Sequence, residues 1–291
     1  MPDRDPAVTR LGPEFRWPGG RRICVVFNLA FEGWSDGVAP PIGPMGNVLK
    51  PGVLDTNAIS WADYGGTRGI WRLLAELDRS GVKASVMVNG VMAERYPEAV
   101  RAIVAAGHEI VPHSWGMDVV PVYLDAEGEA ANLDRTLAAL DRVGARGRGW
   151  ISPRGTPGHT TLELLAARGF DWFGDVFDDD LPYLRRVGER DMVCIPLTME
   201  INDLPFSMRY GNPPPDLPAV LDALLARFRD GEAGPCYADV TAHTHVYGRP
   251  LGAAAYARML DAVTGADDIW VATRAEVADH LRAELGAARA P

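Results

Sequence analysis

The sequence predicts a single-domain α/β fold, a distorted (β/α) barrel of about seven strands. Short apolar runs typical of buried strands alternate with longer runs of helical periodicity almost to the end of the chain. A length of 291 residues is ordinary for one such barrel. No internal repeat or charged linker interrupts the alternation. We therefore place the barrel at residues 23–285, with an N-terminal arm at 1–22 and a C-terminal tail at 286–291.

The strand candidates are short apolar runs bounded by turn-forming or polar residues. In chain order they are Ile23–Ala30, Lys83–Val88, His108–Pro112, Gly149–Ser152, Trp172–Val176, Met192–Leu197, Cys236–Ala242 and Ile269–Ala272. The helix candidates have longer runs with helical periodicity. They are Gly66–Ser80, Val91–Ala106, Ala126–Val143, Thr160–Arg168, Leu217–Asp230, Ala253–Gly265 and Arg274–Leu285. Gly107 is placed to end the second of these helices, after which Ile110 and Val111 form a buried strand.

Two long segments, residues 34–64 and 202–216, interrupt this rhythm. Both are rich in proline or glycine and show no clear helical pattern. Structureless loops of this length inside a compact domain are usually functional. Each follows directly on a predicted strand, so we expect both to wall or cover the functional site, alone or together with a neighbouring subunit.

Composition and charge exclude several classes of function. The net charge of −10, from 29 basic and 39 acidic residues, disfavours binding to nucleic acid or to an anionic membrane. No apolar run is long enough to span a bilayer, and the polar residues 1–22 lack the apolar core of a signal peptide. The three cysteines show no CxxC spacing. We expect a cytoplasmic homo-oligomer, a dimer or tetramer, that acts on a small molecule.

Polar residues gather where the predicted strands end. In a parallel barrel these ends share one face, which is where active sites form. Three of the six histidines fall there. Together with the carboxylates and an arginine, they supply what hydrolysis requires: a group that activates water, an acid for the leaving group and a cation for the oxyanion. The residues are Asn28, Glu32, His113, Asp118, Ser152, Arg154, Glu200, Asn202, Asp203, His243 and His245.

The remaining histidines and an acidic run have structural explanations. His108 begins its strand on the opposite rim, where it caps or packs. His159 precedes a helix, and His280 is expected at the surface of the last helix. The run Asp178–Asp180 is interpreted as a solvated turn rather than a metal site.

Several motifs occur in the order seen in one family. They are Tyr64-Gly65-Gly66 with the leucines that follow it, Gly81–Ser85, Ala93–Pro97 leading into Gly107–Ser114, Cys194–Pro205 with its Asn202-Asp203-Leu204-Pro205, and His243–Pro250. Over about residues 23–281 the chain resembles the polysaccharide-deacetylase (NodB-homology) superfamily. The resemblance implies a NodB-like barrel with its site at the C-terminal face.

The sequence departs from the family pattern at two essential groups. Typical members end the first strand with two aspartates, a general base and a metal ligand, where this chain has Ala30 and Glu32. Their second motif, His-x-x-x-His, supplies two metal ligands, but here the second histidine is replaced by Met117, a poor ligand for a hard or borderline cation. Asp118, one residue further on, could take that place if the turn is altered.

The most similar branch contains the allantoinases and cyclic imide hydrolases (imidases), which open rings, beside a few peptidoglycan deacetylases. It implies hydrolysis of a C–N bond in a small cyclic amide, imide or ureide. Two alternatives stay open: an intracellular N-deacetylase of an acylated amino sugar or small amide, and an inactive barrel kept as a binding protein.

The ring-hydrolase interpretation gives the candidate residues specific roles. His243 is the general acid, and Arg154 orients a carbonyl and stabilises the oxyanion. Glu32 and His113 activate water in one of two ways. They bind one divalent metal, zinc or a similar ion, together with Asp118 or His245, or they act without a metal as a polarising and basic pair. No other cofactor is expected. Aromatic side chains would suit a flat ring as pocket walls. The walls and further substrate contacts are expected from Trp34, Trp61, Trp115, Phe206, Tyr210, Asn202, Asp203 and His245.

Overall fold

The computed structural model describes residues 7–46, 49–50 and 52–287. Its centre is β2 (Ile23–Phe31), which pairs in parallel with β9 (Cys236–His243), with β10 (Ile269–Ala272) and with β3 (Ser85–Val88). β4 (Glu109–Pro112) extends this sheet beside β3. All nine residues of β2 are buried, as expected for a strand covered on both faces.

A second sheet faces the first. β5 (Gly149–Trp150), β6 (Trp172–Phe173) and β8 (Arg190–Cys194) are parallel, whereas β7 (Tyr183–Val187) and β1 (Val8–Thr9) continue the sheet antiparallel. The sequence prediction missed β7, because Arg185 and Arg186 interrupt its apolar pattern. It also missed that the predicted arm, described from residue 7, contributes a strand.

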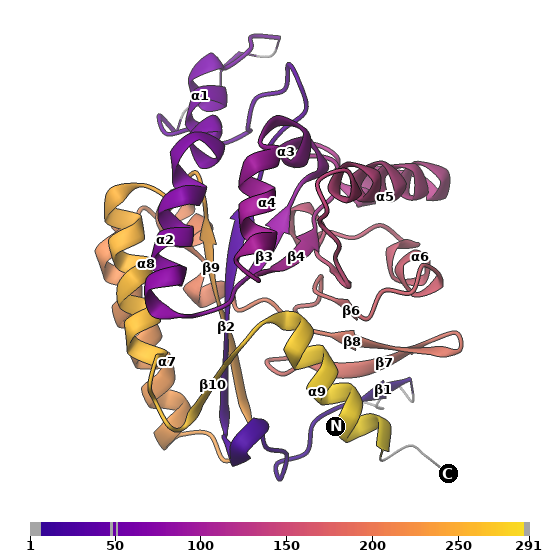
Figure 1. Ribbon diagram of the computed structural model, residues 1–291, viewed down its shortest axis with the longest axis vertical. Helices are drawn as coiled ribbons and strands as arrows, with labels where there is room; N and C mark the ends of the chain where they lie inside the picture. The colour runs from indigo at the N-terminus through magenta and orange to yellow at the C-terminus, as the bar shows by residue number, and fades with distance from the viewer. Residues whose placement is uncertain (1–6, 47–48, 51, 288–291) are drawn as a thin grey trace.

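Helices cover the outside of both sheets (Figure 1). α2 (Ile70–Ser80), α7 (Leu217–Asp230) and α8 (Pro250–Val263) pack beside β2 and β9, and α3 (Gly90–Arg95) and α4 (Pro97–Ala105) lie over β3 and β4. α5 (Ala126–Asp141) and α6 (Thr161–Ala167) complete the layer, whereas α9 (Arg274–Ala287) packs against the interior between the sheets through Val277, Ala278 and Leu281. Residues 288–291 of the predicted tail lie outside the described residues.

Two helix predictions need correction. The predicted helix over residues 91–106 is divided between α3 and α4 at Pro97, since proline favours the first turn of a helix and disfavours its interior. The segment 34–64, expected to lack a helix, contains α1 (Thr56–Tyr64), whose N-terminus is capped by the Asp55 side chain accepting a hydrogen bond from the Ala58 amide.

The space between the sheets is a largely apolar interior that contains the buried ion pair of Arg274 and Asp239. Strand residues alternate between this interior and the helical layer, so Cys24, Val26 and Ala30 of β2 point inward. Deeper in the same interior, the buried Arg274 guanidinium contacts Asp239 on β9 and donates to Asn28 Oδ1 at 3.1 Å. The sheets do not close into a continuous ring of hydrogen bonds over the described residues, so the predicted barrel is present in its distorted, open form.

His280 is also placed differently from the prediction. It is half-buried rather than at the surface, with its ring against Phe15, Trp17 and Trp270. His108 packs as predicted, because its Nδ1 accepts a hydrogen bond from the Ala84 amide at 3.1 Å.

Candidate active site

Glu32, directly after β2, is the centre of the candidate site. Continuing the alternation of β2, its side chain follows Ala30 on the interior side, and it is only 4% exposed. Glu32 Oε1 lies 3.5 Å from His113 Nε2 and 3.4 Å from His243 Nε2. The carboxylate is therefore shared between two histidines that follow β4 and end β9.

An aspartate holds His243. Asp203, which is fully buried, lies 2.6 Å from His243 Nδ1 through Oδ1 and accepts the His243 backbone N–H at 2.8 Å through Oδ2. Asp203 belongs to the long segment 202–216, so this segment reaches the site, as predicted. An Asp–His pair of this kind fixes the orientation of the imidazole and stabilises its protonated form.

The carboxylates of Glu32 and Asp203 favour the charged form of His243. Burial alone would lower the pKa of His243, but the carboxylates of Glu32 and Asp203 raise it to about 10. Burial likewise tends to raise the pKa of Glu32, and here the charge of His243 and the contact with its ring outweigh burial and hold that pKa well below its usual range. At neutral pH the site therefore contains an imidazolium beside an ionised carboxylate.

His113 has the opposite character. Its Nδ1 lies 2.6 Å from the carbonyl oxygen of Ile151, which can only accept, so Nδ1 carries the proton. In the neutral ring, Nε2 then has a free lone pair. Nε2 is buried and has no hydrogen-bond partner among the described residues. The site thus contains one histidine arranged to donate a proton and one arranged to accept it.

The loop after His113 is fixed by Asn89, which follows β3. Asn89 Oδ1 accepts the Gly33 N–H at 2.9 Å, and its Nδ2 donates to the His113 carbonyl. The next residue, Ser114, has a φ of 60°, an uncommon backbone conformation for a residue other than glycine. Such strain concentrates at functional sites, and here it redirects the chain immediately after the histidine.

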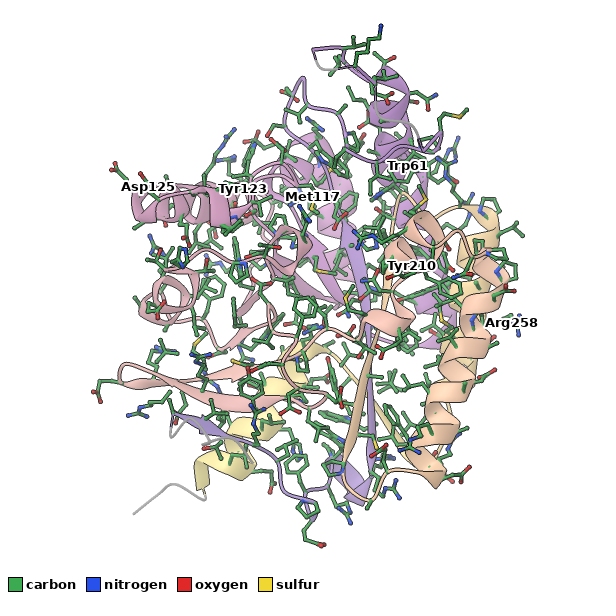
Figure 2. All side chains as sticks on the ribbon, turned by 180° about the vertical axis from the view of Figure 1, so that it is seen from behind. Trp61, Met117, Tyr123, Asp125, Tyr210 and Arg258 are labelled. Atoms are coloured by element: carbon green, nitrogen blue, oxygen red, sulfur yellow. The ribbon has the colours of Figure 1, made fainter. Side chains whose placement is uncertain are left out.

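His245 and two tryptophans form an aromatic wall beside this centre. The ring of His245 meets Trp61 edge-on at 4.5 Å and Trp34 at 5.8 Å between centroids. Burial lowers the pKa of His245 to about 3, so it is neutral, and its Nδ1 has no partner among the described residues. Figure 2 shows Trp61 in the upper part of the molecule, on α1 above the carboxyl end of β2. The segment 34–64 therefore walls the site, as predicted.

A close approach between backbone segments positions the turn that carries His243 and His245. A Cβ added to Gly69 would lie 1.9 Å from the Thr244 carbonyl oxygen, and one added to Gly248 would lie 2.0 Å from the same atom. Gly69 ends the π-helix Gly65–Gly69, which leads into α2. Both positions need glycine because backbone packs directly on backbone there.

A cavity of about 270 Å³ borders Glu32 on the side of α1 and α3. Trp34, Asp63, Arg95 and Tyr96 line it, together with the backbone of residues 35–38. Arg95 forms an ion pair with Asp36 at 2.5 Å. The four central residues, Glu32, His113, Asp203 and His243, are at most 5% exposed, so this cavity is a natural approach to an otherwise closed site.

Several predicted site residues lie elsewhere. Trp115 packs against Gly90 of α3, beneath the Arg135 guanidinium, because the Ser114 turn carries it away from the interior. Tyr210 is 71% exposed. Asn202 caps the next turn through Leu204 N, Phe206 packs against the helical core, and Arg154 is exposed. The proposed roles of Trp115 and Tyr210 as pocket walls are therefore corrected.

The residues do not fit a resident divalent metal, which the family resemblance implied. Asp118 is exposed and its Oδ1 accepts the Ser35 N–H at 2.8 Å, which anchors the loop after β2 rather than forming a ligand. Figure 2 labels Met117 at the position of the expected second histidine. Among the described residues, no group of three or more His, Cys, Asp or Glu side chains is arranged to hold a metal ion. Glu32 and His113 alone fall short of the usual three protein ligands of a catalytic site.

The sequence prediction missed one buried carboxylate at the site. Asp175, two residues after β6, accepts the Ser152 N–H at 2.8 Å through Oδ1 and is 7% exposed. It lies inside the apolar run Trp172–Val176, where a charged residue is costly unless it has a partner. That isolated acid in a predicted strand was the available signal.

An α/β barrel with an acid–base pair of histidines and a carboxylate at its strand ends has the groups that hydrolysis requires. The comparisons agree. The polysaccharide deacetylase family model matches residues 58–173. A crystal structure from Mycobacterium smegmatis, described as a "putative polysaccharide deacetylase", is 30% identical, with 96% of each chain covered and a TM-score of 0.81.

Two further relatives are similar over much of their length. The crystal structure of Puue allantoinase is 27% identical with a TM-score of 0.83, and 94% of each chain is covered. A peptidoglycan deacetylase of Helicobacter pylori is 27% identical over 195 residues, 58% of this chain and 64% of the relative. This chain belongs to the polysaccharide deacetylase family and has its distorted (β/α) barrel fold. It is a hydrolase that acts on carbon–nitrogen bonds other than peptide bonds.

No helix in the described part of the chain combines the length and apolar character needed to cross a membrane.

Proposed function

We propose that the protein opens a small cyclic amide, imide or ureide by attack of water on the ring carbonyl. The observation that carries this proposal is the position of Glu32 between two histidines of opposite character. His113 has an unpartnered Nε2, whereas His243 is held by Asp203 as a proton donor. An acid and a base on either side of one carboxylate suit a reaction that needs both at once.

The chemistry follows from these groups without a metal. His113 Nε2 removes a proton from water, and Glu32 orients that water and stabilises the resulting imidazolium. The hydroxide adds to the ring carbonyl. The protonated His243 lies 3.4 Å from Glu32 and therefore faces the same carbonyl and ring nitrogen. His243 then gives its proton to the ring nitrogen as the C–N bond breaks.

The surroundings favour a small flat ring over a sugar chain. The site is closed by Trp34 and Trp61, and the adjoining cavity is about 270 Å³. Ala30 is fully buried in the apolar interior and places a methyl group where a typical family member has a charged base. An apolar floor with few polar groups suits a ring with one polar edge. The similarity to an allantoinase, a ring-opening enzyme by its name, supports the same choice.

We expect the wild-type protein to prefer a five- or six-membered cyclic imide to an N-acetylated sugar by roughly tenfold or more in kcat/KM. We also expect Ala30→Asp to lower ring opening roughly tenfold, because a second buried carboxylate near Glu32 opposes its ionisation. The assay compares both proteins on a cyclic imide, a ureide, an acyclic amide and an N-acetylated sugar. A preference for the sugar that Ala30→Asp increases further would replace the proposal with the deacetylase alternative.

The deacetylase alternative is supported by the similarities to the polysaccharide deacetylase family model, to the Mycobacterium smegmatis structure and to a peptidoglycan deacetylase. It uses the same acid–base pair at an acetamide carbonyl and releases acetate. A folded protein that turns over no member of the panel would instead support the third possibility, a barrel kept for binding.

Removal of metal is expected to leave kcat/KM unchanged, because Glu32 and His113 have no third ligand among the residues that the structure describes. The measurement is the rate after exhaustive chelation, with elemental analysis of the same sample. The control adds zinc back to the chelated protein. A loss of activity that zinc restores, together with one bound ion per chain, would show that the ligand set is completed in solution.

A further inference from the structure

A single peptide group connects Asp175 with His113. The Ile151–Ser152 peptide donates through its N–H to Asp175 Oδ1 at 2.8 Å. The carbonyl oxygen of the same peptide lies 2.6 Å from His113 Nδ1. The order is therefore carboxylate, peptide N–H, peptide C=O and imidazole N–H, with every donor facing an acceptor.

Such a series of linked groups has a physical effect beyond its separate hydrogen bonds. A negative charge at the N–H end of a peptide polarises the group and makes its carbonyl oxygen a stronger acceptor. A stronger acceptor at Nδ1 favours the tautomer with the proton on Nδ1 and makes Nε2 more basic. In this site Nε2 is the atom that faces Glu32.

The surroundings of Asp175 fit this purpose. Burial raises its pKa to about 6, opposed by hydrogen bonds from Ser152 and by the charge of Arg274, so it is ionised at neutral pH. Its second oxygen, Oδ2, is buried without a hydrogen-bond partner among the described residues. No ion pair of the described residues neutralises it directly, so its charge acts on the Ser152 amide and on the His113 ring beyond.

We propose that Asp175 is a positioning residue that acts on His113 through the Ile151–Ser152 peptide group, holding the proton on Nδ1 and the lone pair of Nε2 toward Glu32. The two histidines of the site are then supported by aspartates in different ways. Asp203 contacts His243 directly and keeps it protonated, whereas Asp175 acts at a distance of one peptide and fixes the tautomer of His113. The proposal rests on the assigned role of His113 as base, and its first test is independent of any substrate.

The direct test is the tautomer of His113, measured by ¹⁵N chemical shifts of histidine-labelled protein, with the His113 signals assigned from a His113→Gln variant. In the wild-type protein at neutral pH we expect the Nδ1–H tautomer alone. In Asp175→Ala we expect the Nε2–H tautomer to become populated, and in Asp175→Asn, which keeps an acceptor oxygen but not the charge, an intermediate result. Asp180→Asn, an exposed acid on the same segment, is the matched control and should match the wild type.

Activity gives the second readout. Asp175→Asn should lower kcat by roughly tenfold to a hundredfold with little change in KM, the size typical of residues that orient a functional histidine from behind. Wild-type protein with the Nε2–H tautomer would overturn the proposal without any variant. So would a folded Asp175→Asn or Asp175→Ala variant with an unchanged tautomer. If instead the tautomers behave as expected but no panel substrate is turned over, the positioning role stands and the ring-hydrolase assignment fails.

Discussion

Replacing His243 with glutamine is expected to lower kcat by roughly 10² to 10⁴ while KM changes little. The reason is that His243 is the group held by Asp203 and Glu32 as an imidazolium, and glutamine cannot give a proton to the leaving nitrogen. Steady-state rates and a thermal unfolding scan of the same preparations measure this. His159→Gln, at an exposed position, serves as the control. A folded His243→Gln protein with nearly normal kcat would remove this residue from the mechanism.

The pH profile tests the same residue without deleting it. His243 must be protonated to act, and its pKa is raised to about 10 by Glu32 and Asp203. Activity should therefore persist into alkaline solution and fall as the pH rises through about 10. Asp203→Asn removes one of the two carboxylates, so the alkaline fall of kcat/KM should move to lower pH. A fall at the same pH in both proteins would mean that another group controls it.

The second large effect is expected on stability rather than on rate. Arg274→Met should lower the free energy of unfolding by about 3–5 kcal/mol, because it leaves Asp239 charged and buried without its partner. The guanidinium is fully buried and also donates to the Ile195 carbonyl at 3.0 Å and to Asn28 at 3.1 Å. Urea denaturation followed by circular dichroism gives the value.

A double variant separates the lost charge pair from the lost packing. Adding Asp239→Asn to Arg274→Met should restore part of the stability, since no unpaired charge then stays in the interior. Arg229→Met, which breaks an exposed pair with Asp268, is the control and should cost less than about 1 kcal/mol. Equal losses for Arg274→Met and the control would show that water reaches the interior pair.

Sequence periodicity was sufficient to predict the residues at the centre of the site. Glu32, His113 and His243 each follow or end an apolar run, and in a parallel sheet such positions share one rim. The departure from the family at Ala30 and Met117 could also be recognised from spacing alone. The pairing of Asp203 with His243 could not, because it depends on how the segment 202–216 folds back over the sheet.

The errors have physical causes that the sequence does not show. The direction of an aromatic side chain in a loop depends on the local backbone, and the positive φ of Ser114 sends Trp115 outward. Asp175 was missed although it lies within a predicted apolar strand, and Arg274 was missed because it begins a predicted helix, where a charged residue resembles a surface position. Only the fold shows that both point into the protein, toward Ser152 and Asp239.

The contact between Asp203 and His243 also links a proton to a movement. The pKa of His243 in the folded protein lies above its ordinary value of about 6.5. The bound proton therefore stabilises the contact with Asp203 fully below about pH 6.5, and this stabilisation is lost as the pH rises through about 10. By reciprocity, any displacement of the segment that carries Asp203 lowers the proton affinity of His243. Transfer of the proton from His243 to the leaving nitrogen therefore weakens the contact that holds this segment, at the moment when the product has to depart.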